Sequence, residues 1–94
     1  MTIEHNLTSL ALIDTQLHAA NLAWAEAQAA VNDATRCHLI SLDERSSTAH
    51  QQAIEAMHAA LARDQALHRA QTLTNEHEAV VAAIVAQLAD RVQP

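Results

Sequence analysis

Residues 10–34 read LALIDTQLHAANLAWAEAQAAVNDA, and their apolar positions recur at alternating intervals of three and four residues. Large side chains form one column of this heptad pattern and mostly alanines form the other: Leu10, Leu17, Trp24 and Val31 against Ile13, Ala20, Ala27 and Ala34. Such a pattern is typical of an α-helix with one packed face. Because small residues let a second helix approach closely, we expect an antiparallel neighbour against this seam.

The composition extends the helical prediction to the whole chain. No glycine occurs in the 94 residues, the one proline is Pro94, and 22 positions are alanine. Glycine and proline are the usual interrupters of a helix, so an almost wholly α-helical chain is predicted. Their absence also removes the glycine turns on which phosphate loops and nucleophile elbows depend.

The hydrophobic core available to such a chain is thin. A single domain over residues 1–94 buries only about 60–65% of its unfolded surface. Of the apolar residues, 22 are alanines, and each alanine buries roughly one methyl group. Trp24 is the only aromatic residue. We therefore expect oligomerisation or a partner protein to complete the core.

The helix boundaries follow from the few segments that interrupt the apolar pattern. A first helix is expected over about residues 7–41, capped by Thr2 or Asn6 and weakest at Asn32. Residues 41–48 read SLDERSST and predict the main turn. Helices over about 48–72 and 75–92 follow, with a kink or short break near Thr74. The predicted fold is all-α, an elongated antiparallel helical hairpin or three-helix arrangement that completes a bundle by oligomerisation.

An oligomer or partner interface is predicted on the apolar arcs of the first two helices. Trp24 is central to it, because a lone aromatic in an alanine-rich seam supplies a disproportionate share of the buried area. On the second helix the expected apolar arc includes Met57 and Leu61. The predicted interface residues are Leu10, Ile13, Leu17, Trp24, Val31, Met57 and Leu61.

The charge balance indicates which partners suit the chain. Eleven acidic residues against five arginines give a formal net charge of −6. This charge repels phosphate backbones and anionic lipid, so we expect no nucleic acid or membrane as a partner, and favour a protein with a basic surface. No signal-peptide pattern and no 18-residue apolar run occur, and the single thiol of Cys37 suits a reducing compartment. The expected location is the cytoplasm.

A metal site is an alternative from a different class. Glu55 and His58 have the Glu-x-x-His spacing of carboxylate di-iron bundles, and Glu26 on the first helix could add a carboxylate. Glu55 and His58 project away from the expected apolar arc, however, whereas such sites face a bundle core. We predict no catalytic residue, cofactor or metal, and keep Glu26, Glu55 and His58 as the metal-binding hypothesis.

Two further clusters on the second helix could carry chemistry. Asp64 and His68, on the expected apolar arc, would form a buried hydrogen-bonded pair, but no nucleophile accompanies them. Arg63 and Arg69 could hold a small anion, although arginines in an acidic chain more often pair with carboxylates. The leading prediction is a non-enzymatic protein that self-associates and binds a basic protein as an inhibitor or adaptor. A metal-binding oligomer and an oligomer that sequesters a small anionic ligand are the alternatives.

Overall fold

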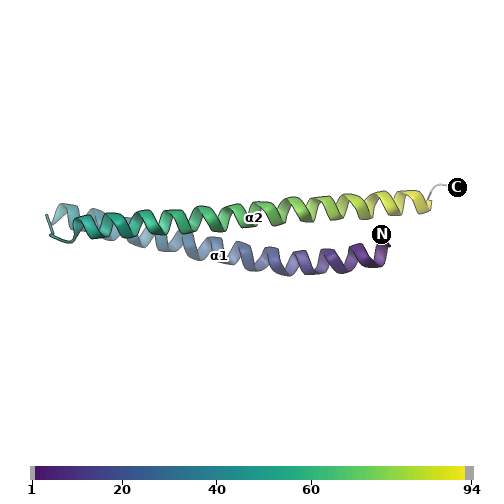
Figure 1. Ribbon diagram of the computed structural model, residues 1–94, viewed down its shortest axis with the longest axis horizontal. Coiled ribbons are helices and arrows are strands. Elements are labelled where there is room, and N and C mark those ends of the chain that lie inside the picture. Colours follow the sequence, from purple (N-terminus) through teal and green to yellow (C-terminus); the bar gives the residue numbers. More distant parts are fainter. Residues whose placement is uncertain (1, 93–94) are drawn as a thin grey trace.

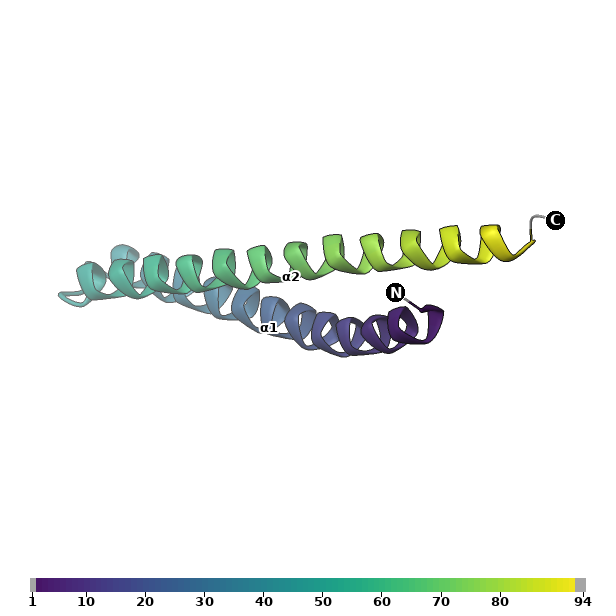
Figure 2. The same cartoon turned by 45° about the vertical axis from the view of Figure 1, so that its right-hand side comes forward.

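The computed structural model describes residues 2–92, which form two long helices joined by a short turn (Figure 1). Helix α1 spans Ile3–Asp43 and helix α2 spans Ala49–Val92. The helices lie side by side and run antiparallel, so that α1 starts and α2 ends at the same end of the molecule (Figures 1 and 2). The predicted all-α fold and the elongated hairpin are confirmed, and the three-helix arrangement is wrong.

The hairpin is a thin rod rather than a sphere. Its Cα atoms extend over 75 × 17 × 13 Å, with a radius of gyration of 21.0 Å, whereas a compact domain of this length has a radius of gyration of about 12 Å. No large side chain of residues 2–92 is less than 2% exposed. Within the same residues, neither helix offers a stretch that is long and apolar enough to cross a membrane.

Both helices continue through the points at which a break was expected. Helix α2 runs without interruption past Thr74, so the predicted boundary between helices at 72–75 is wrong. The Thr74 hydroxyl donates to the carbonyl oxygen of Ala70 at 2.8 Å, which satisfies it inside the helix instead of at a cap. Leu73 beside it is buried and anchors this turn against α1. Helix α1 also continues through Asn32, whose side-chain oxygen accepts a hydrogen bond from Gln28.

The two candidate caps of α1 have different roles. The backbone N–H of His5 donates to the Thr2 hydroxyl at 3.1 Å, so Thr2 is the N-cap. Asn6 is only 6% exposed and points towards α2 instead. Its side-chain amide donates to the side-chain oxygen of Gln87 at 2.8 Å, which joins the open end of the hairpin.

The turn reverses the chain without glycine. Arg45 has a φ of 54°, in the left-handed region. Its N–H bonds to the carbonyl oxygen of Leu42 at 3.2 Å, and the N–H of Ser46 bonds to that of Ser41 at 2.8 Å. These two bonds close the last turn of α1 as a Schellman motif. The Ser46 side chain then accepts the Thr48 N–H at 3.2 Å, at the start of α2.

We expect Arg45→Gly to raise the free energy of unfolding by about 0.5–1 kcal/mol, because a side chain with a Cβ costs energy in the left-handed region and glycine does not. The gain is reduced by the greater freedom of glycine in the unfolded chain. Urea unfolding followed by circular dichroism measures it. Arg45→Ala keeps the Cβ and should bring no gain; an equal gain for alanine would locate the effect in the lost charge.

Alanines bring the helices together along the middle of the rod. Ala20, Ala70 and Leu73 are 3%, 6% and 6% exposed and form the buried cluster, against which Leu17 packs. Near the turn, His38 Nδ1 lies 3.2 Å from the carbonyl oxygen of Ala49, a contact that also joins the helices. The seam predicted for residues 10–34 is therefore the side of α1 that faces α2.

Candidate interaction surface

The structure turns most of the predicted interface residues of α1 towards α2. Leu17 packs against the buried cluster, and Leu10, Ile13 and Val31 at the same heptad positions are half-buried. Much of their apolar area is therefore used within the chain. That they also contact a second chain stays a prediction.

Trp24 differs from these neighbours because 37% of its surface is exposed. It lines a shallow groove of about 240 Å³ between the two helices. Asn21 of α1 and Leu67, Gln71 and Thr74 of α2 also line this groove. Trp24 is thus open to a second protein from one side of the hairpin.

Two residues of the predicted apolar arc of α2 do not face α1, and their part in an interface stays a prediction. Met57 and Leu61 are 70% and 58% exposed, because the residues that face α1 along this half of the helix are mostly alanines. Small residues on both helices let the backbones approach, which Met57 and Leu61 in the seam would prevent. The buried and half-buried residues at three- and four-residue spacing are Ala49, Gln52, Ala56, Ala59, Arg63, Ala66, Ala70, Leu73, His77, Val80, Ile84 and Gln87.

Two grooves define the two long sides of the hairpin. The groove at Trp24 marks one side, and a second groove of about 280 Å³, lined by Gln16, Ala23 and Arg69 among others, marks the other. Asn21 and Ala23 belong to different grooves because positions two apart on a helix point about 200° apart. Residues seven apart point in nearly the same direction, so each groove can be extended along the rod.

Large apolar side chains gather on the side marked by Trp24. On α2, Val81 and Leu88 lie seven and fourteen residues after Thr74, and Val85 lies fourteen residues after Gln71. All three therefore point to the side on which Thr74 and Gln71 line the groove. We call this the apolar side, and its exposed large residues are Leu7, Leu39, Leu42, Met57, Val81, Val85, Leu88 and Val92. The spacing of four, three and four residues through 81, 85, 88 and 92 is the sequence signal for the part of this side that lies on α2.

Carboxylates gather on the other side, which we call the acidic side. Its acidic residues, in register with Ala19 of α1 or with Arg69 of α2, are Glu26, Asp33, Glu55, Glu76 and Asp90. On the apolar side, Asp14 lies 2.7 Å from His77 Nε2, and Asp64 lies 3.3 Å from Arg63 Nε. Glu78, seven residues after Gln71, is a further exposed carboxylate of the apolar side, and Asp33 of the acidic side contacts Arg36 at 3.4 Å. The acidic side still holds more carboxylates, and the large exposed apolar residues distinguish the apolar side from it.

The side chains proposed for other chemistry lie on the surface. Glu26, Glu55 and His58 are exposed, and residues 2–92 contain no group of three or more His, Cys, Asp or Glu side chains placed to hold a metal ion. Asp64 and His68 are also exposed, since this face of α2 turns away from α1. Asp64 contacts Arg63 at 3.3 Å, and a pair of Asp64 and His68 within an interface stays a prediction.

The arginines proposed to hold an anion do not act as a pair. Arg63 is half-buried in the seam, where its Nε contacts Asp64 at 3.3 Å. Arg69 is exposed beside the groove of the acidic side. The two side chains therefore have different surroundings, one carboxylate-paired and one open.

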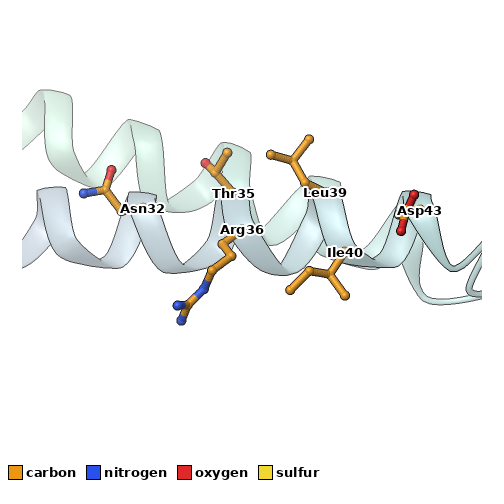
Figure 3. A pocket seen from close by; sticks show the side chains of 6 residues that line it. All are labelled: Asn32, Thr35, Arg36, Leu39, Ile40 and Asp43. Atoms are coloured by element: carbon orange, nitrogen blue, oxygen red, sulfur yellow. The ribbon is translucent and has the colours of Figure 1, made fainter.

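A further hollow, of about 460 Å³, lies on α1 near the turn. All six residues that line it belong to α1, and Figure 3 shows Thr35 and Leu39 on one edge of the helix and Arg36 and Ile40 on the other. Ligand pockets of small molecules enclose most of the ligand surface. A hollow along a single helix instead suits contact with another protein surface.

Comparison with known protein families, with curated proteins and with solved structures finds no match.

Proposed function

We propose that this chain is a non-enzymatic helical hairpin that acts in the cytoplasm by binding other protein chains, including a second copy of itself. The observation that carries the proposal is the set of large apolar side chains left exposed, among them Leu39, Met57 and Val85 at 59%, 70% and 59%. Contiguous exposed apolar surface is typical of protein interaction sites. The shallow grooves and open hollow support the same function.

The charge supports a partner with a basic surface. The chain carries a net charge of −6, and the carboxylates of the acidic side are spread along both helices. A row of like charges steers an oppositely charged protein and fixes its orientation more than it adds affinity. We propose that the acidic side binds a basic protein, which the hairpin inhibits or links to other components.

Retention of a basic partner at low salt tests this function. Untagged chain isolated from its own cells should carry a basic protein that dissociates as salt rises, because exposed charges are screened. A variant with Glu26→Gln, Glu76→Gln and Asp90→Asn should lose that protein. Glu4→Gln with Glu78→Gln removes charge elsewhere and is the control that should retain it. Equal retention by both variants would contradict a role for the acidic side.

A further inference from the structure

We propose that a second copy of this chain docks on the apolar side of the hairpin, so that two hairpins form a four-helix bundle. The inference deepens the proposed function, on which it rests, because it assigns self-association to one surface. It also divides the roles of the two sides. The apolar side joins the copies, and the acidic side stays free for the basic partner.

The area left uncovered matches what a stable dimer needs. The accessible surface is 6837 Å², whereas a folded monomer of this mass exposes about 5,300 Å². The difference, about 1,500 Å² per chain, amounts to about 3,000 Å² for a pair. Permanent homodimers bury roughly 2,000–5,000 Å² in total. A second hairpin of the same length covers this area along the whole rod, which a small partner does not.

The side chains of the apolar side are arranged for a helix–helix interface. Val81, Val85, Leu88 and Val92 alternate at four- and three-residue intervals, the spacing by which one helix packs against another. At the other end of the rod, Met57 is the most exposed large residue of this side after Val92. Large groups at both ends favour an occupant as long as the hairpin itself.

Charge decides which side the copies share. Two copies that docked through their acidic sides would bring the carboxylates of one against those of the other, which costs binding energy. Near the middle of the apolar side, Asp14 contacts His77 and Asp64 contacts the cationic Arg63, while Glu78 is exposed there. Two-fold symmetry presents the same patch on both copies, so the side with fewer unpaired charges is the one that fits itself.

Sedimentation velocity and native mass spectrometry of the untagged chain test the proposal. We expect twice the 10.2 kDa chain mass for the wild type. Val85→Glu with Leu88→Glu should raise the dissociation constant at least about 100-fold, because two carboxylates enter an apolar interface. Leu12→Glu with Leu22→Glu is a matched control: these residues are 59% and 55% exposed against 59% and 49%, and lie outside the apolar side. This control should remain dimeric.

Each other outcome overturns the proposal. A wild-type monomer at high micromolar concentration, or an assembly larger than two chains, excludes the four-helix bundle. Equal loss in both variants excludes the assigned side. If the chain from its own cells carries a different protein that Val85→Glu with Leu88→Glu releases, that protein is the occupant. Circular dichroism checks folding, and Val85→Gln with Leu88→Gln replaces the charged pair if helicity falls.

Failure of the dimer and failure of the proposed function give different results. A monomer whose basic partner is still lost on neutralising Glu26, Glu76 and Asp90 removes the docking proposal and the self-association on which it rests, and leaves the binding of a basic partner in place. A dimer that retains no protein through those carboxylates removes only the basic partner. Cys37, which is exposed and in register with Gln16 and Ala23 on the acidic side, takes a fluorescent label for both assays without touching the apolar side.

Discussion

Leu73→Ala is expected to lower the free energy of unfolding by about 2–3 kcal/mol, at the lower end of the range for buried leucines because the thin seam can partly close the cavity. Leu73 is 6% exposed and is the only large apolar side chain among the buried residues of the described range 2–92, where it packs with Ala20 and Ala70. A domain of this size is stable by only about 5–15 kcal/mol. Urea unfolding followed by circular dichroism at several protein concentrations measures the loss and separates it from dissociation of an oligomer.

Leu61→Ala is the control for this substitution. Leu61 lies on the same helix but is 58% exposed. The same chemical change there should alter the free energy of unfolding by no more than about 0.5 kcal/mol. If the two substitutions destabilise the chain equally, Leu73 is not part of a packed seam and the rotation of α2 is different from the one described.

The sequence predicts α1 well because its pattern leaves little choice. Residues 10–34 place large side chains in one column and small ones in the next, and only one face of a helix satisfies both. The structure accordingly places Ala20 at 3% exposure and Leu17 against the buried cluster. Glycine-free composition also predicts the length of the helix, which the structure extends to Ile3–Asp43.

The sequence does not predict the rotation of α2, because apolar residues occur on several of its faces. Met57 and Leu61 form an arc that looks like a core, whereas Ala56 and Ala59 form another that looks like a surface rich in helix-forming residues. The choice depends on α1. Its alanine column favours small partners, and the hydrogen bond from Asn6 to Gln87 agrees with the same rotation.

The continuous backbone near residue 74 shows a second limit of sequence reasoning. Thr74 and Asn75 belong to the residues that cap helices, and an isolated peptide could end there. In the hairpin, Leu73 contributes to the buried cluster, and Thr74 bonds back to Ala70. Packing on α1 therefore holds the helix through a segment of weak helix formers.

The two sides of the hairpin follow only after both helix rotations are known. Val81, Val85 and Leu88 are recognisable from the sequence as a stripe on one helix. Whether Leu42 of α1 shares that side depends on how α1 and α2 face each other, which the groove between Asn21 and Leu67 establishes. The candidate surface is thus a property of the pair of helices and not of either one.

Ala20→Leu is expected to lower the free energy of unfolding by about 1–3 kcal/mol, because the added atoms have no space in the seam and force the helices apart or into strained rotamers. Ala20 is 3% exposed, the lowest value among the core residues. Urea unfolding measures the loss, and Ala29→Leu is the control, since Ala29 is exposed on the same helix and the same change should be nearly neutral there.

Combining Ala20→Leu with Leu73→Ala gives the sharper form of this prediction. The two residues belong to one buried cluster, so the volume added at Ala20 can fill part of the space lost at Leu73. We expect the double variant to be more stable, by at least about 1 kcal/mol, than the sum of the single losses implies. Strict additivity would mean that the two side chains do not share a packed site, and the antiparallel alignment of the helices would have to change by at least one helical turn. Compensation would instead support the described alignment of α1 with α2. The assignment of the apolar side and of the acidic side depends on that alignment.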